Sequence, residues 1–307
     1  MKIVLFGATD LTVSIANFLF KNNYTLSAIV TVPSIFNISY DKDVIKNIRF
    51  KDMFVWGNKR KIPVFSYIKV QETIQDLIPL KPDFAIVAGW YHLMPKRLRL
   101  LFSKGCSGFH ASLLPQLRGG APLNWAILLG LTKTGVSYFE LSDQVDDGLL
   151  YAQRAFLIGE KHDIATLIRK TEFYVLEILQ EVLPKVSQGD HKKYQQVGIP
   201  SYCGQRKPMD SLINWRQSTE KILRLIRAST KPYAGAYTFF NTSKVIIFKA
   251  SFNNKLTIVG SPGQVFKIFD EWYVACGRGS IILNDFFTEV KLKNQCRFTN
   301  RVTESFK

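Results

Sequence analysis

Residues 2–32, KIVLFGATDLTVSIANFLFKNNYTLSAIVTV, decide the fold because their hydrophobic pattern changes twice. Residues 2–6 form a short apolar run that ends at Gly7, and residues 11–20 then carry apolar side chains at helical spacing. The run at residues 26–32 is apolar again. A short apolar run is typical of a buried strand, whereas the longer periodic segment is typical of a helix. The stretch therefore predicts a strand, a helix and a second strand.

Residues 83–89, DFAIVAG, predict another buried strand further along the chain. Strands that alternate with helices predict the α/β class, here a Rossmann-like, doubly wound, parallel sheet. Ligands of such folds bind at the carboxyl ends of the strands. Gly7, the Gly89–Trp90 pair and His110 all follow such ends, so we expect the site there. The GATDL at residues 7–11 is not a G-x-G-x-x-G loop, which argues against a dinucleotide cofactor.

The second half of the chain predicts a different architecture. Residues 163–183 predict a long helix that ends at Pro184. Its expected apolar stripe is Ile164, Leu167, Ile168, Phe173, Leu176, Leu179 and Val182. A basic amphipathic helix through Ile222 and Ile226 is followed by β-like runs at residues 236–240, 245–248, 256–259, 264–268, 273–275 and 281–283. We expect an α/β domain at 1–186, a linker at 187–207, and a small, mostly β, OB-like barrel at 208–307.

Composition limits the classes of function. The chain has 307 residues, of which 47% are hydrophobic and 21% charged, and this is typical of a globular protein. We expect no membrane span, because no apolar run is long enough. Four cysteines without CxxC spacing, in a chain with no evident export signal, predict reduced thiols and a cytoplasmic location. The four histidines lie far apart, so no metal site is expected.

The net charge of +17 is concentrated towards the end of the chain, where residues 201–307 hold 17 basic and 7 acidic side chains. A basic domain can attract RNA, anionic lipid or a polyanionic small molecule. A solvated basic surface without a partner is the alternative, and the sequence leaves both open.

The chemistry is concentrated in residues 105–147, GCSGFHASLLPQLRGGAPLNWAILLGLTKTGVSYFELSDQVDD. Here His110 is followed by a Ser-Leu-Leu-Pro at 112–115, an Arg-Gly at 118–119 and the acidic pair Asp146–Asp147. This pattern resembles the enzymes that take a formyl group from N10-formyltetrahydrofolate. Their signature is Asn-x-His-x-Ser-Leu-Leu-Pro, then an Arg-Gly and a later Asp. In this chain Gly108 stands where that family has the Asn.

Formyl transfer places an amine against a carbonyl carbon, so it needs an oxyanion donor and a proton acceptor. The resemblance implies that His110 donates to the oxyanion. It implies that Asp146 holds the imidazole or takes the proton, directly or through water. A water, a backbone amide or Ser107 is expected to replace the missing Asn. Loss of one oxyanion donor costs roughly 2.7–4 kcal/mol in barrier. Gly108 is alternatively there for a positive φ angle.

The expected substrate-binding and cofactor-binding residues share a position in this motif or at the strand end before it. They are Gly89, Trp90, Tyr91, Gly108, Ser112, Leu113, Arg118, Gly119, Asn124 and Asp147. Arg118 fits either a structural or a phosphate contact. Ser112 and the Leu-Leu-Pro also fit a packed turn that fixes His110. Asp147 is expected to be a turn neighbour of Asp146.

The resemblance extends over nearly the whole chain and leaves two branches of the family. The branch that formylates methionyl-tRNA usually carries a loop of the type DRPAGRGKK after its second strand, whereas residues 31–47 here read TVPSIFNISYDKDVIKN. Residues 123–125, Leu-Asn-Trp, are closer to the branch that formylates nucleotide-linked amino-sugars, as in lipopolysaccharide biosynthesis. We therefore expect that reaction, with N10-formyltetrahydrofolate as formyl donor. The sequence leaves the oligomeric state open, with a homodimer as one option. The alternatives are a methionyl-tRNA formyltransferase, which alone requires nucleic acid, and an impaired homologue that only binds folate or nucleotide.

Overall fold

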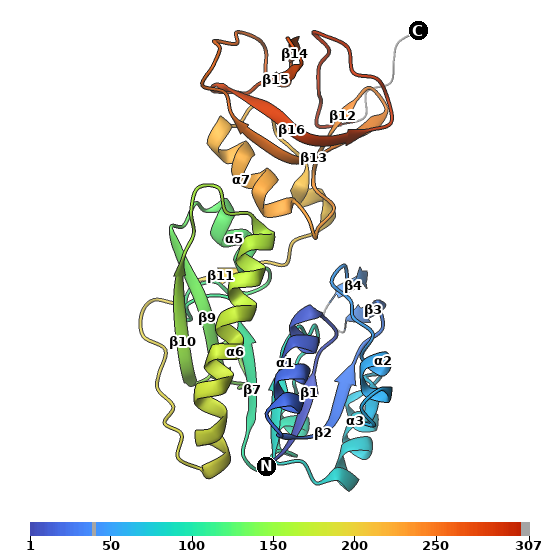
Figure 1. Ribbon diagram of the computed structural model, residues 1–307, viewed down its shortest axis with the longest axis vertical. Coiled ribbons are helices and arrows are strands. Elements are labelled where there is room, and N and C mark those ends of the chain that lie inside the picture. The colour runs from blue at the N-terminus through green and yellow to red at the C-terminus, as the bar shows by residue number, and fades with distance from the viewer. Residues whose placement is uncertain (39–40, 302–307) are drawn as a thin grey trace. The chain divides into compact units, whose positions relative to one another are not determined.

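A computed structural model describes residues 1–38 and 41–301 (Figure 1). The chain forms two compact units. Unit 1 comprises Met1–Gly119, Thr134–Phe156 and Arg169–Cys203, and unit 2 comprises Gly120–Lys133, Leu157–Ile168 and Gly204–Lys307. Most of the predicted linker thus groups with unit 1, and two segments of the predicted N-terminal domain group with unit 2.

Unit 1 is built on a seven-stranded sheet with the order β10-β9-β7-β6-β1-β2-β5. Its strands are β1 (Lys2–Phe6), β2 (Thr25–Thr31), β5 (Val64–Ser66), β6 (Phe84–Val87), β7 (Cys106–His110), β9 (Lys133–Glu140) and β10 (Leu150–Leu157). The pairs from β7 through β6, β1 and β2 to β5 are parallel, whereas β9 runs antiparallel to β7. The predicted α/β class with a mainly parallel sheet is therefore confirmed.

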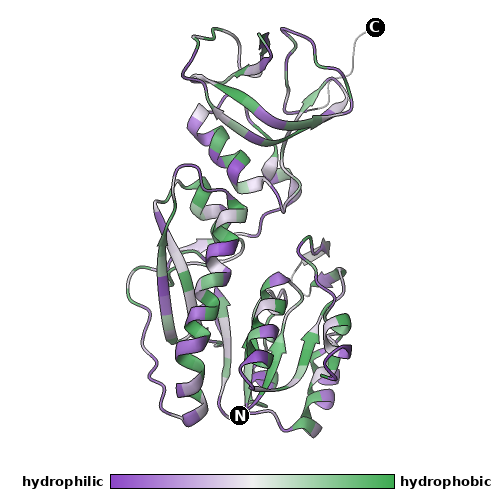
Figure 2. Ribbon diagram, viewed as in Figure 1, coloured by the Kyte–Doolittle hydropathy of each residue, from purple (hydrophilic) through white to green (hydrophobic). Residues whose placement is uncertain are grey.

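The helices of the first half of the chain are α1 (Asp10–Lys21), α2 (Met53–Asn58), α3 (Val70–Leu77) with the 3-10 turn η1 (Ile78–Leu80), α4 (Lys96–Arg99) and α5 (Pro122–Leu128). Strands β1 and β6 consist mostly of buried hydrophobic residues, as expected for strands covered on both faces. The helices are amphipathic (Figure 2). The first turn of α1, just after β1, is tied to the end of β6, because Thr12 Oγ1 donates to Ala88 O at 2.9 Å. A Cβ on Gly7 would lie 2.1 Å from the same oxygen, so the two strand ends approach closely.

A hairpin that the sequence patterns do not predict follows β2. It consists of β3 (Ile35–Ile38) and β4 (Asp41–Lys46), which pair antiparallel. The hairpin occupies the stretch in which methionyl-tRNA formyltransferases were expected to carry their basic loop. Asn47, directly after it, donates from Nδ2 to Ala8 O at 3.0 Å and so fixes its base to the turn after β1.

The long helix α6 (Ile164–Gln188) corrects two expectations. It does not end at Pro184 but continues to Gln188, because proline interrupts only the local backbone bond and Val186 beyond it is fully buried. Phe173 is not part of the apolar stripe, since 64% of it is exposed. Within residues 1–38 and 41–301, no helix is long and apolar enough to cross a membrane.

Unit 2 contains a five-stranded antiparallel sheet with the order β12-β13-β16-β15-β14. Its elements are η2 (Pro208–Ser211), α7 (Thr219–Ser229), β12 (Ala236–Phe240), β13 (Ser243–Phe252), β14 (Val265–Ile268), β15 (Glu271–Ala275) and β16 (Ser280–Thr288). Ile222 and Ile226 of α7 belong to one core cluster with Val245 and Ile281 of the sheet. The prediction of a mostly β region at the end of the chain is therefore confirmed.

The ends of this sheet are linked by the residues that follow it. Phe239 of edge strand β12 bridges to Thr299, and Gln264, next to edge strand β14, bridges to Arg297. The segment thus closes part of the gap between the two edges, which is the arrangement expected of a partly open barrel. The expected strand at 256–259 is wrong. Val259 there is 87% exposed, and the Asn253 side chain accepts from the amides of Lys255 and Leu256 in a turn instead.

Candidate active site

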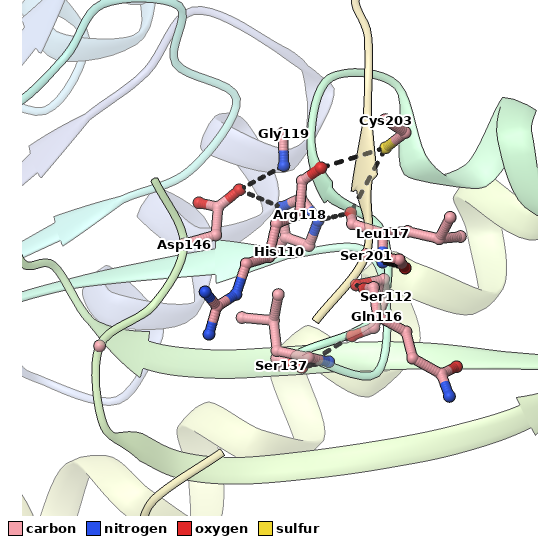
Figure 3. A network of polar contacts seen from close by, with 12 residues as sticks. His110, Ser112, Gln116, Leu117, Arg118, Gly119, Ser137, Asp146, Ser201 and Cys203 are labelled. Atoms are coloured by element: carbon pink, nitrogen blue, oxygen red, sulfur yellow. Dashed lines mark hydrogen bonds and ion pairs between the residues drawn. The ribbon is translucent and has the colours of Figure 1, made fainter. Parts of the chain in front are cut away.

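The imidazole of His110 and the carboxylate of Asp146 contact each other at the carboxyl end of β7 (Figure 3). His110 is the last residue of the strand, and Asp146 lies in the loop that joins β9 to β10. His110 Nδ1 lies 3.3 Å from Asp146 Oδ2, and only 7% of His110 is exposed. His110 Nε2 lies 2.7 Å from Leu117 O. A neutral imidazole has one N–H and donates to only one of these acceptors, whereas a protonated ring donates to both.

The two carboxylate oxygens of Asp146 differ in their contacts. Oδ2 accepts from Gly119 N at 2.8 Å in addition to facing His110. Among the described residues, none donates to Oδ1, and the side chain is 20% exposed. The residue has a φ of 51°, a left-handed conformation that Asp adopts more readily than most residues. The carboxylate is therefore placed to accept a proton from a group outside the protein.

The loop that carries Gly119 is fixed by the segment after α6. Strand β8 (Arg118–Gly119) pairs in parallel with β11 (Tyr202–Cys203). Gly119 has a φ of +96°, and a Cβ on it would lie 2.5 Å from Cys203 O, so glycine is required there. Burial, and then the charge of Asp146, raises the pKa of the Cys203 thiol to about 11. Cys203 is thus a protonated donor, which lies 3.4 Å from Leu117 O and from Arg118 O, and not a nucleophile.

Arg118 makes its contacts within the protein. Its Nε and Nη2 donate to Gln196 Oε1 at 3.2 and 2.6 Å, and Nη1 donates to Tyr202 Oη at 3.2 Å. The guanidinium also lies 5.8 Å from the centre of the Tyr202 ring. These contacts support the structural interpretation of Arg118.

Three further residues of the motif have their polar or apolar groups engaged. Ser112 is 1% exposed and donates to Gln116 O at 2.5 Å, while its backbone oxygen accepts from Ser137. Leu113 packs against Gly135. Asp147 accepts from the Ser142 hydroxyl in its own loop. These contacts fit the packed-turn interpretation, and a substrate contact for any of the three stays a prediction.

Gly108 faces an apolar neighbour. A Cβ on it would lie 2.9 Å from Leu141 Cδ2. Gly108 is not among the described residues with a positive φ, so that explanation for the glycine is wrong. The expectation that Ser107 replaces the missing Asn as oxyanion donor is also wrong. Ser107 is fully buried, points to the other face of β7, and contacts Ala85 O at 2.8 Å and Tyr138 Oη at 2.9 Å.

A second group of predicted residues lies at the end of β6. Gly89 has a φ of +67° and packs against Thr9. Trp90 contacts the rings of Phe6 and Tyr67 edge to face. Tyr91 donates to Asn47 Oδ1 at 3.0 Å.

This aromatic cluster, which consists of Phe36, Tyr67, Trp90, Tyr91 and His92, contains two polar atoms without a partner. Trp90 Nε1 and His92 Nε2 are buried, and neither has a hydrogen bond within residues 1–38 and 41–301. Burial lowers the pKa of His92, so its ring is held neutral. The cluster offers flat apolar faces together with free ring nitrogens.

Asn124 belongs to a different unit from His110 and Asp146. It lies in α5, which belongs to unit 2, and its Nδ2 donates to Ala228 O at 2.8 Å. Asn124 is buried, with only 8% of it exposed, and its amide joins α5 to the end of α7. Its predicted contact with a ligand remains a prediction.

The sequence patterns miss the residues that support the pair from the segment after α6. These are Gln196, Ser201, Tyr202 and Cys203, together with Leu117. The segment is rich in residues typical of loops and gives no periodic signal. The described residues contain no group of three or more His, Cys, Asp or Glu side chains that could hold a metal ion.

Two family matches cover most of the chain. Residues 42–183 match the family described as formyl transferase, and residues 206–297 match the formyl transferase C-terminal domain. A methionyl-tRNA formyltransferase of Caldanaerobacter subterraneus subsp. tengcongensis is 30% identical over 92% of this chain and 90% of its own length. The chain belongs to the formyltransferase family.

A further relative and a solved structure of the same fold are enzymes of different names. The bifunctional polymyxin resistance protein ArnA of Wigglesworthia glossinidia brevipalpis is 29% identical over 98% of this chain, which spans 45% of that protein. The solved N-formyltransferase of Helicobacter canadensis, in complex with folinic acid and dTDP-3-aminofucose, has a TM-score of 0.69 and 17% identity. That match covers 94% of this chain and 100% of the other.

Members of the formyltransferase family are enzymes that use N10-formyltetrahydrofolate as formyl donor, and this chain shares that activity class. The family therefore fixes the group transferred and its donor. It leaves open which amine receives the formyl group, since the relatives include enzymes for tRNA and enzymes for sugars.

Proposed function

We propose that this formyltransferase transfers the formyl group of N10-formyltetrahydrofolate to the amino group of a nucleotide-linked amino-sugar, with His110 and Asp146 as catalytic residues. The observation that carries the chemistry is the buried His110 beside a carboxylate whose Oδ1 is free to accept a proton. The acceptor class rests on separate observations, given below.

The reaction needs one proton acceptor and one oxyanion donor. The amine attacks the formyl carbon, its new C–N bond forms, and the formyl oxygen becomes an oxyanion. The bond from carbon to N10 then breaks, and N10 leaves with the proton that Asp146 has taken from the amine and returns, directly or through water. Asp146 takes the proton that the amine loses, while the His110 N–H supports the oxyanion. Because Leu117 O faces Nε2 at 2.7 Å, His110 shares this donor with the backbone or releases it when substrate binds.

The residues at the end of β6 fit the flat ring system of the folate. Phe36, Tyr67 and Trp90 supply aromatic faces, and Trp90 Nε1 and His92 Nε2 are polar atoms that have no partner among the described residues. A pterin ring carries donors and acceptors around its edge, and it would use both atoms. This region would therefore hold the donor and orient its formyl group towards His110.

Three observations support a sugar amine. The stretch after β2 forms a short hairpin, where the tRNA branch has a loop rich in Gly, Arg and Lys. Residues 123–125 read Leu-Asn-Trp. The Helicobacter canadensis enzyme, which binds a nucleotide-linked amino-sugar, matches this chain over its full length. The basic character of the chain would favour the diphosphate of such an acceptor.

Methionyl-tRNA is the second candidate acceptor. Methionyl-tRNA formyltransferases are about as similar in sequence as the polymyxin resistance protein, and the chain covers 90% of one of them. The excess of basic residues in 201–307 would suit an RNA. Lipopolysaccharide modification as the purpose of the reaction belongs to the sugar hypothesis alone.

The test is a formylation assay with N10-formyltetrahydrofolate and a panel of nucleotide-linked amino-sugars and methionyl-tRNA. We expect mass spectrometry to show one added formyl group on a sugar amine. Higher kcat/KM on methionyl-tRNA would replace the proposal by the second candidate. Binding of folate and nucleotide without product from any acceptor would identify an impaired homologue.

A further inference from the structure

The side-chain amide of Gln196 uses all of its hydrogen-bonding groups beside the catalytic pair. Its Nε2 donates to Asp146 O at 2.8 Å and to Gly148 O at 2.9 Å. Its Oε1 accepts from Nε and Nη2 of Arg118 at 3.2 and 2.6 Å. One side chain from the segment after α6 therefore joins the Asp146 loop to β8, the strand that contains Gly119.

These bonds act where the backbone is strained. Asp146 has a φ of 51°, and a non-glycine residue in that region is held there by its surroundings. The two carbonyl groups that Gln196 binds lie on either side of Asp147, so they fix the turn that presents the Asp146 carboxylate. Without them, the carboxylate would lose its fixed distance to His110 Nδ1 and to Gly119 N.

We propose that Gln196 is a positioning residue for formyl transfer, which holds Asp146 in place beside His110. The inference rests on the proposed function in one respect, namely that this pair performs the chemistry. Gln196 acts through the Asp146 backbone and not on the reacting atoms. A side chain that merely stabilised the fold would change the amount of folded enzyme, whereas a positioning residue changes kcat of the folded enzyme.

Two substitutions of Gln196 distinguish the contribution of its Nε2 donor from that of its Oε1 acceptor. Gln196→Met keeps the length of the side chain and removes all four bonds. Gln196→Glu keeps the acceptors for Arg118 but replaces the donor by an oxygen that repels the carbonyls of Asp146 and Gly148. The matched controls are Gln195→Met and Gln195→Glu, because Gln195 is the same residue type at the preceding position and is exposed.

Both Gln196 variants should lower kcat about 10- to 100-fold, the range expected for a misplaced catalytic group. The KM for the formyl donor should change less than about twofold, since ground-state binding is not altered. The Gln195 variants should match the wild type. If Gln196→Glu keeps the wild-type kcat and only Gln196→Met loses it, the effect lies at Arg118 and the proposal is overturned. Unchanged kcat in both variants also overturns it.

A second readout does not depend on activity. The Gly119 N–H donates to Asp146 Oδ2 at 2.8 Å, so its hydrogen exchange reports where the carboxylate is. We expect faster exchange of this amide in Gln196→Met than in wild type or Gln195→Met, while amides of the buried strand β1 stay equally protected. Unchanged Gly119 exchange would overturn the positioning role. An inactive wild type would instead overturn the proposed function, and the exchange result would still decide the role of Gln196.

Discussion

Leu141 Cδ2 lies 2.9 Å from the point that a Cβ on Gly108 would occupy. Leu141 also packs against the cluster formed by Leu114, Phe139 and Leu150. The place where the family signature has an Asn side chain is thus next to a packed leucine. Gly108 and Leu141 are therefore best understood as a pair, and a change at one of them has to be judged with the other.

The Gly108→Asn substitution should lower kcat/KM and not raise it, because the new side chain must displace Leu141. The double variant Gly108→Asn with Leu141→Ala should be more active than Gly108→Asn alone. Steady-state kinetics with the best acceptor measures both. A rise of about 10²–10³ in the single variant, the worth of one oxyanion donor, would show instead that the natural enzyme lacks a group it could use.

His110→Ala and Asp146→Ala should each lower turnover by at least about 10², because each removes a group that supports proton transfer or the oxyanion. The double variant should lose little more than the worse single variant, since groups that act as one unit are not additive. Asp143→Ala is the control, because Asp143 lies in the same loop but pairs with Arg99. Near-normal turnover of a folded His110 or Asp146 variant would remove that residue from the mechanism.

Gly119→Ala should lower the free energy of unfolding more than Gly189→Ala does. Both glycines have a positive φ, +96° and +80°, so both substitutions carry the backbone penalty of about 1–2 kcal/mol. Only Gly119 meets a further obstacle, because its Cβ would lie 2.5 Å from Cys203 O, whereas a Cβ on Gly189 would have no atom of a more distant described residue within 4 Å. Denaturant unfolding measures the two losses. Equal losses would mean that β8 and β11 separate easily.

His92→Phe should make stability less sensitive to acid. Burial lowers the pKa of His92 below its usual 6.5, so the unfolded chain binds more protons than the folded chain as the pH falls through 6.5. Stability is therefore lost as the pH falls through that value, and Phe removes this loss. Thermal unfolding at about pH 7.5 and about pH 5.5 should show a smaller drop in Tm for the variant than for wild type. An equal or larger drop would contradict the neutral, buried state of His92.

Much of the fold could be predicted because its signal is local. The apolar runs that became β1, β2 and β6 are short and uninterrupted, and such runs are typical of parallel strands buried on both faces. The closeness of His110 and Asp146 followed from the family resemblance. Their catalytic role remains a prediction that the substitutions above address.

The residues that were missed have no local signal. Gln196 lies 50 positions from the Asp146 oxygen that it binds, and nothing in its neighbourhood of the sequence indicates that contact. Tertiary packing also overrode local rules. Helix α6 continues past Pro184 because Val186 is buried, whereas the apolar residues at 256–259 pair with no strand of the described residues.

The pairing of β8 with β11 also sets a lower limit on the size of an active fragment. A chain cut after α6, at Gln188, would keep His110, Asp146 and the whole seven-stranded sheet. It would lose Gln196, Ser201 and the backbone of Tyr202–Cys203, on which the loop of Leu117, Arg118 and Gly119 depends. We therefore predict that a minimal catalytic fragment, whether made in the laboratory or fused to another protein in evolution, extends at least to Cys203.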